Sequence, residues 1–270
     1  MNSFCNGGNK MTKKMIMFDI DGTLLDHDKK LPASAKEAVK SLKEAGHEVA
    51  FATGRAPYFI KDLRKELEID SFICFNGQYV EIENEVIYKN PIDRELLAHL
   101  SGFSTTQNHP LVYMGAEFMR STFDYHSDIE ESLTSLNIDT TQIVMDASYY
   151  NDTEIYQTLL YCKEHEETLY RDNLRKLNFI RWHEYSMDVL PLGGSKAKGI
   201  EKFIEKKGFS KDQVYAFGDN LNDIEMLQYA GHSVAMGNAP EEVKKAARYV
   251  TKDVGEDGIA YGLQMVGLLS

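Results

Sequence analysis

The sequence predicts an α/β protein built on a doubly wound, Rossmann-like parallel sheet that a second α/β domain interrupts. Three observations lead to this fold class. Short apolar strands alternate with amphipathic helices at both ends of the chain, as in sheets that carry helices on both faces. This alternation stops in the middle of the 270-residue chain, where short elements of both kinds mix. The same middle section is more acidic than its flanks, as expected of a separate domain.

The N-terminal elements follow a βαβαβ order. Residues 13–20 (KKMIMFDI) form an apolar run that ends in an acidic turn, as buried parallel strands do. A helix is expected from Pro32, which suits a first turn, to Gly46, which ends it. The next elements are a strand at 48–52, a helix through Leu67, a strand at 71–75, and a hairpin over 78–88 with its turn at Glu83 and Asn84.

The middle of the chain contains candidate strands at 112–114, 142–145 and 177–182, and the strand–helix alternation resumes at Ser195. From there we expect a helix through Lys207, a strand at 214–217, a helix at 223–230, a strand at 233–235, a helix at 240–247 and a last strand at 249–250. We assign residues 11–83 and 187–270 to a discontinuous core and residues 84–186 to an inserted domain. Residues 1–10 are polar and rich in Gly and Asn, which predicts a disordered extension.

Composition and charge exclude several classes of function. The net charge of −12 argues against nucleic acid as a partner, because Lys and Arg hold phosphate backbones. Residues 84–186 contain 17 acidic and 8 basic residues, which also makes anionic polymers poor ligands. No uncharged apolar run is long enough to suggest a membrane span. The cysteines Cys5, Cys74 and Cys162 form no metal-binding spacing, and such a scattered set predicts a cytoplasmic location.

The first chemical motif, from Asp19 to Thr23 (DIDGT), follows the first strand. Open α/β sheets bind ligands at the carboxyl ends of their strands, so its two carboxylates lie where a ligand is expected. One aspartate can attack phosphorus while the other moves a proton, and main-chain N–H groups near Gly22 can hold phosphate oxygens. An ordinary acidic turn is the alternative. A calcium loop fits poorly because it would need Asp or Asn at Thr23 and Gly at Leu24.

Two further motifs supply groups that suit a phosphate. Thr53-Gly54-Arg55 follows the second strand, where a hydroxyl and a main-chain N–H at a helix start can bind a phosphate oxygen; a plain helix cap is the alternative. Lys196 begins a helix, although that end of a helix favours anions. Its position makes sense where the ammonium neutralises a carboxylate and a phosphate. A solvated surface lysine is the alternative, and Lys198 is the rival for the same role.

The fourth motif, from Gly218 to Asp223 (GDNLND), follows the strand at 214–217. Two acids and two amides on one turn after a buried strand suit a hard cation with oxygen ligands. A structural turn would tolerate these residues but rarely needs so many together. The motif therefore favours a cation site over a turn with no function.

Together the four motifs resemble the haloacid dehalogenase superfamily and, within it, the Cof-like phosphatases. The matching segments are FDIDGTLL at 18–25, ATGR at 52–55, Ser195-Lys196 and GDNLND at 218–223, with further likeness at Asn76-Gly77, AMGNA at 235–239 and EDGI at 256–259. The likeness covers both sections of the core. It extends to the position and length of the middle segment, where the family inserts an α/β cap. Ala197 departs from the pattern, since many relatives have Gly after the lysine.

The resemblance implies a magnesium-dependent phosphatase that acts on a small phosphate ester. Asp19 would be the nucleophile and Asp21 the general acid and base. Mg²⁺ would be held by the carboxylates of Asp19 and Asp219 and by the main-chain carbonyl of Asp21, while Asp223 would order its water shell. The phosphate would be held by Ile20, Thr53, Gly54, Lys196 and Asn222.

Three functions stay open: hydrolysis of a small phosphomonoester, phosphoryl transfer as in a phosphomutase, and a catalytically silent phospho-ligand sensor. Hydrolysis is favoured, because Mg²⁺ and Lys196 would offset the repulsion between an anionic nucleophile and an anionic phosphate, and Asp21 can activate water. Sugar phosphates are the family-level expectation for the substrate. Six cap side chains either line a substrate pocket or form the cap's own core: Tyr113, Met114, Phe118, Met119, Phe123 and Tyr125.

Overall fold

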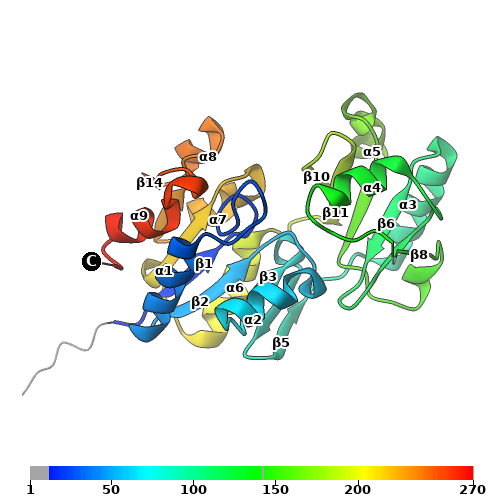
Figure 1. Cartoon of the computed structure of the whole chain (residues 1–270). Helices are drawn as coiled ribbons and strands as arrows, with labels where there is room; N and C mark the ends of the chain where they lie inside the picture. Colours follow the sequence, from blue (N-terminus) through cyan, green and yellow to red (C-terminus); the bar gives the residue numbers. More distant parts are fainter. Residues whose placement is uncertain (1–11, 142, 270) are drawn as a thin grey trace, which may run out of the picture.

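The computed structural model describes residues 12–141 and 143–269, so the extension predicted at 1–10 lies outside the described residues. Two β-sheets organise the described chain, and each sheet has its own helices (Figure 1). The larger sheet is built from both ends of the chain and the smaller sheet from its middle. The predicted α/β class, with a second α/β domain inserted into a parallel-sheet core, is confirmed.

The larger sheet has eight strands in the order β14-β13-β12-β1-β2-β3-β4-β5. In its middle, β1 (Met15–Phe18) pairs in parallel with β12 (Val214–Gly218) and β2 (Glu48–Ala52). All four residues of β1 are buried, which explains why this strand is uniformly apolar rather than alternating. The remaining strands are β13 (His232–Ala235), β14 (Tyr249–Val250), β3 (Phe72–Cys74) and the antiparallel hairpin of β4 (Tyr79–Ile82) and β5 (Glu85–Lys89).

Helices cover both faces of this sheet. One face carries α1 (Ala33–Glu44), α2 (Lys61–Leu67) and α9 (Gly258–Met265). The other face carries α6 (Lys196–Lys207), α7 (Ile224–Tyr229) and α8 (Glu241–Ala246). Alternate residues of β1 accordingly belong to different cores, because Ile16 and Phe18 face α1 whereas Met15 and Met17 face α6. This sandwich fixes the strand ends that carry the motifs.

The smaller sheet, in green shades in Figure 1, has six strands in the order β10-β11-β9-β6-β7-β8. These strands are β6 (Leu111–Met114), β7 (Met119–Ser121), β8 (Val144–Met145), β9 (Gln157–Tyr161), β10 (Leu177–Arg181) and β11 (Ser186–Pro191). Helices α3 (Arg94–Gln107) and α5 (Glu167–Asn173) pack on one face, against Tyr113 and Leu160. The shorter α4 (Ser127–Thr134) packs on the opposite face, against Val112 and Leu159.

Within the described residues, short 3₁₀ segments link these elements: Pro57–Ile60, Phe75–Gly77, Tyr149–Asn151, Glu164–Glu166, Lys211–Gln213, Leu221–Asp223 and Val254–Glu256. The predicted strands and helices of the flanks are present within a few residues. Strand β8 is shorter than the strand predicted at 142–145, of which Gln142 lies outside the described residues. Strands β7, β9 and β11 and helices α3, α4, α5 and α9 were not predicted individually. Across 12–141 and 143–269, no helix is long and apolar enough to cross a membrane.

The boundaries of two strands indicate where the chain passes between the two domains. Residues 85–89 form β5 of the larger sheet, and residues 186–191 form β11 of the smaller sheet. We therefore propose crossings near residues 90 and 192, in place of the predicted 83 and 186. The inserted domain between these crossings is called the cap below, and the remainder is called the core.

Candidate active site

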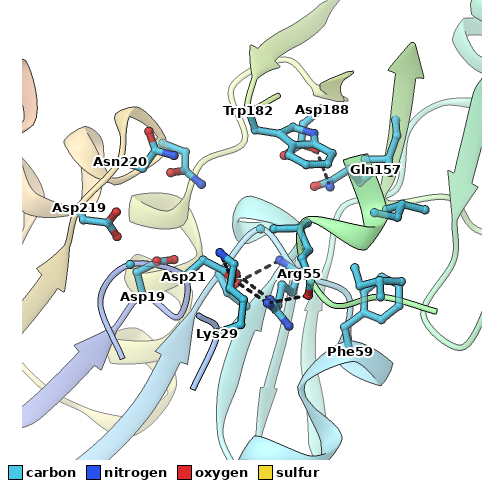
Figure 2. A pocket seen from close by; sticks show the side chains of 18 of the residues that line it. Asp19, Asp21, Lys29, Arg55, Phe59, Gln157, Trp182, Asp188, Asp219 and Asn220 are labelled. Carbon is cyan, nitrogen blue, oxygen red and sulfur yellow. Dashed lines mark hydrogen bonds and ion pairs between the residues drawn. The ribbon is translucent and has the colours of Figure 1, made fainter. Parts of the chain in front are cut away.

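Three strand ends that carry motifs lie side by side in the core. Strands β12, β1 and β2 are parallel neighbours, so their carboxyl ends meet at one edge of the sheet. Asp19 follows β1, Thr53 follows β2 and Asp219 follows β12, and all three line one cavity. Figure 2 shows Asp19 and Asp219 at this edge, below side chains that reach down from the cap.

Three carboxylates and one lysine converge at the edge. Asp19, Asp219 and Asp223 each have an oxygen within 4.8 Å of those of the other two. Lys196, at the start of α6, lies between two of them, with Nζ 2.5 Å from Asp19 Oδ1 and 2.6 Å from Asp223 Oδ1. Its side chain is 0% exposed, so it is no solvated surface lysine. Lys198 instead makes an exposed ion pair within α6.

The carboxylate cluster carries more negative charge than one ammonium neutralises. Burial raises the pKa of Asp219 to about 7, and the charge of Asp223 adds to this effect. Burial also raises the pKa of Asp19, against the opposing attraction of Lys196. The pKa of Lys196 is raised because the charges of Asp19 and Asp223 outweigh the effect of burial. Oxygen donors with an excess of buried negative charge are the environment that a hard divalent cation prefers, so the donor set fits Mg²⁺.

Hydrogen bonds fix the acidic turn that follows β12. Asp223 Oδ2 accepts the main-chain N–H of Asp219 at 2.9 Å and of Asn220 at 3.0 Å, which leaves its other oxygen to Lys196. Thr23 donates its hydroxyl to Asp219 Oδ1 at 2.7 Å. The close approach of the two turns requires Gly22, which has φ 82° and where a Cβ would collide with the Asp219 carboxylate.

The side chain of Asp21 belongs to a separate group of charges (Figure 2). Arg55 donates from Nε and Nη2 to its two oxygens at 2.7 Å each, and Lys29 Nζ lies 2.9 Å from Oδ1. Burial raises the pKa of Asp21, but the hydrogen bonds and charges of Arg55 and Lys29 outweigh burial, and the net pKa is lowered. The sequence placed Arg55 in a motif without giving it a role, and it gave no signal for Lys29.

The predicted phosphate-binding residues surround the same edge. Thr53, Gly54 and Asn222 line the cavity. Thr53 Oγ1 accepts the N–H of Arg55 at 3.1 Å, so its hydroxyl proton stays available for a phosphate oxygen. Asn222 Nδ2 donates to the Asn76 side chain at 2.9 Å. Ile20 is buried, and its carbonyl accepts three N–H groups of the following turn, so only its main chain can take part.

The cavity has a volume of about 400 Å³ and lies between the core and the cap. Its cap side is formed by Met114, Leu133, Leu136, Ile138, Gln157, Leu159, Trp182 and Asp188. Of the six cap side chains considered from the sequence, Met114 lines the cavity, whereas Tyr113 packs on the opposite face of the cap sheet. Phe118 and Tyr125 are exposed, and Met119 and Phe123 are half-buried outside the cavity lining.

A buried amide–carboxyl network joins the core to the cap. Asn76, after β3, donates from Nδ2 to Asp188 Oδ2 at 2.9 Å and to Gln157 Oε1 at 3.2 Å. Gln157 Nε2 in turn donates to Asp188 Oδ1 at 2.9 Å. Burial raises the pKa of Asp188 to about 7, although the Asn76 hydrogen bond works against this. The sequence marked Asn76 only as part of a family-like stretch, and it gave no signal for Gln157 or Asp188.

Comparisons with known proteins agree on one family. A model described as haloacid dehalogenase-like hydrolase matches residues 16–263. The Bacillus subtilis protein YkrA, which carries a phosphatase name, is 46% identical over 96% of this chain and 100% of its own length. The Escherichia coli pyridoxal phosphate phosphatase YbhA is 31% identical over 93% of this chain and 97% of its own. The solved structure of the subclass IIB sugar phosphatase BT4131 is 30% identical, with a TM-score of 0.86 over 95% of this chain and 100% of that one.

Proposed function

The chain belongs to the haloacid dehalogenase-like hydrolase family and is a phosphatase, and from that premise we propose that it hydrolyses a small phosphomonoester through an aspartyl-phosphate on Asp19. The observation that carries the proposal is the buried contact of Lys196 with both Asp19 and Asp223. A lysine in that place neutralises a nucleophilic carboxylate and remains beside the point where a phosphate would meet it.

In the first step, a carboxylate oxygen of Asp19 would attack phosphorus as the bond from phosphorus to the ester oxygen breaks. Asp21 would give a proton to the departing alcohol. Water would then attack the phosphorus of the aspartyl-phosphate, Asp21 would take the proton from that water, and Asp19 would be released with inorganic phosphate. Thr53, Gly54 and Asn222, which line the cavity, and Lys196, which contacts Asp19, would hold the phosphate oxygens during both steps.

Mg²⁺ is the cofactor that we propose for this site. The carboxylates of Asp19 and Asp219 and the main-chain carbonyl of Asp21 would bind it, with Asp223 ordering its water ligands. When bound, the ion supplies positive charge that offsets the repulsion between the phosphate and the carboxylates. The raised pKa values of Asp19 and Asp219 support a cation here, because both carboxylates lie in a buried cluster with excess negative charge.

Asp21 has to change its contacts to act as a general acid and base. Both of its oxygens are occupied by Arg55, and Lys29 holds one of them as well. Arg55 also reaches the cap, where Nη2 lies 3.4 Å from the main-chain oxygen of Leu136. We propose that a bound ester displaces part of this Arg55 contact, so that one oxygen of Asp21 can face the leaving group.

The proposal is accompanied by expectations for the substrate, the cellular location and the phosphoryl acceptor. The names of the relatives, a sugar phosphatase and a pyridoxal phosphate phosphatase, support a small phosphorylated metabolite as the substrate. The cytoplasmic location inferred from the cysteines stays a prediction; Cys74 and Cys162 are buried free thiols. Phosphoryl transfer to an acceptor other than water would use the same aspartyl-phosphate, and release of inorganic phosphate distinguishes hydrolysis from it.

The experiment that tests the proposal is phosphate release from a chromogenic aryl phosphate by the parent and by Asp19→Asn. The amide of asparagine cannot attack phosphorus, whereas the near-isosteric change should leave the fold intact in a thermal melt. We expect the activity of the parent to require Mg²⁺ and to be lost in excess chelator. The larger Ca²⁺ should support this activity poorly. More than a few per cent of parental activity in folded Asp19→Asn would contradict the nucleophile assignment, and full activity in chelator would contradict the metal site.

A further inference from the structure

The cavity has two chemically different halves. The core half contains the carboxylates, Lys29 and Arg55 around the proposed phosphate position. The cap half is where the alcohol part of an ester would lie, and five of its eight lining residues are aliphatic: Met114, Leu133, Leu136, Ile138 and Leu159. Trp182 adds an aromatic ring whose Nε1–H has no hydrogen-bond partner among the described residues, and Gln157 and Asp188 are the other polar side chains of this half.

The cap sheet explains why these residues share one side of the cavity. Side chains alternate between the two faces of a strand, and paired residues of neighbouring strands point to the same face. Met114 of β6 is paired with Gln157 of β9, and Leu159 of β9 is paired with Asp188 of β11. The part of this face that lines the cavity is therefore apolar except for the Gln157–Asp188 pair. Tyr113 lies on the other face and takes no part in it.

Apart from Trp182 Nε1, the polar groups near this surface are largely engaged. Asp188 accepts one hydrogen bond at each oxygen, and Gln157 donates to Asp188 and accepts from Asn76. On the core side, Arg55 and Lys29 both bind Asp21. A leaving group with four or five hydroxyls would therefore place most of them against hydrocarbon without a partner, which is costly for each buried hydroxyl. A flat ring would instead contact the aliphatic side chains and Trp182, with one polar edge at Asp188.

We infer that the cap half of the cavity selects a ring-bearing alcohol, aromatic or heteroaromatic with one hydrogen-bonding edge, over a polyhydroxylated sugar as the leaving group. This inference rests on the proposed phosphatase reaction and narrows the expectation of a sugar phosphate. Trp182 supplies the ring contact, and the Gln157–Asp188 pair supplies the polar contact. Leu136 and Leu133 form the apolar wall near α4.

The test compares esters of matched intrinsic reactivity. Benzyl phosphate, pyridylmethyl phosphate and glucose 6-phosphate all release a primary alcohol, so differences in kcat/KM report the fit of the leaving group. We expect both ring esters to exceed glucose 6-phosphate by about 100-fold, since each hydroxyl buried without a partner lowers kcat/KM by roughly tenfold. Equal or better turnover of glucose 6-phosphate would overturn the inference but leave the hydrolysis intact. Failure of every ester, a chromogenic aryl phosphate included, would overturn the proposed function and the inference with it.

A pair of cap variants assigns the effect to the cavity. Trp182→Leu should lower kcat/KM for benzyl phosphate by about tenfold and change that for ethyl phosphate by less than about twofold, because only the larger ester reaches the ring. Phe118→Leu is the matched control, since Phe118 is a cap aromatic that is 54% exposed and does not line the cavity. Thermal melts establish that both variants are folded. An equal loss for both esters in Trp182→Leu, or the same shift in Phe118→Leu, would contradict the assignment.

Discussion

Replacing Lys196 by methionine removes the cation from the most deeply buried charge cluster of the described chain. Methionine has a similar length but no charge, so Asp19 and Asp223 would keep their buried carboxylates without an ammonium partner. Removing one member of a buried ion pair costs about 3–5 kcal/mol of stability. Each kcal/mol lowers the melting temperature of a domain this size by about 2–4 °C, so Lys196→Met should melt roughly 6–20 °C below the parent. Mg²⁺ should restore part of the difference, because it binds the same carboxylates.

The matched control is Lys198→Met, two residues further along the same helix. Its exposed i,i+3 ion pair is worth at most about 0.5 kcal/mol, so its melting temperature should change by about 2 °C or less. Differential scanning fluorimetry with and without Mg²⁺, together with phosphate release, compares the two variants directly. If Lys196→Met melted and turned over like the parent, or if Lys198→Met were equally impaired, the role given to Lys196 would be wrong.

Two further predictions concern pH. Arg55→Met should raise the pKa of Asp21, so the limb of the pH profile of kcat/KM that reports Asp21 should move to higher pH. Lys29→Met removes one contact to Asp21 where Arg55→Met removes two, so it should move that limb less. A limb that does not move in Arg55→Met would contradict the pairing of Arg55 with Asp21. Asp188 has its folded-state pKa raised to about 7, so its stabilising effect is present at low pH and is lost as pH rises toward 7. The melting temperature of the parent should therefore fall relative to Asp188→Asn between pH 5 and pH 8, by an amount equivalent to about 3 kcal/mol, because about two pH units of this window lie below the raised pKa. Parallel curves would contradict this origin of the pH dependence.

The core and its strand ends could be predicted from the sequence because local patterns specify them. An apolar run such as β1, followed at once by Asp19, identifies both a buried strand and the residue at its end. Parallel order then brings the ends of β12, β1 and β2 together without any knowledge of side-chain contacts. The choice between Lys196 and Lys198 needed the structure, since only burial distinguishes two lysines on one helical turn.

The contacts between core and cap could not be predicted in this way. Asn76, Gln157 and Asp188 are far apart in the sequence, and their network exists only because the cap sheet packs over the end of β3. The burial of the cap side chains could not be predicted either. Tyr113 and Met114 are adjacent in β6, so their side chains point to opposite faces of the cap sheet, Tyr113 into the cap core and Met114 into the cavity. The sequence alone does not identify which face of the strand packs into the core.

The central claim is a covalent phosphate on Asp19, and rapid acid quench followed by peptide mass spectrometry tests it most directly. Asp21→Asn is the variant to use beside the parent, because loss of the general base should slow hydrolysis of the intermediate after it has formed. We predict that the peptide containing Asp19 gains the mass of one phosphoryl group in the presence of Mg²⁺ and ester, and that Asp19→Asn shows no such gain. Release of phosphate with no modified peptide under any quench time, or a phosphoryl group on a residue other than Asp19, would contradict the account.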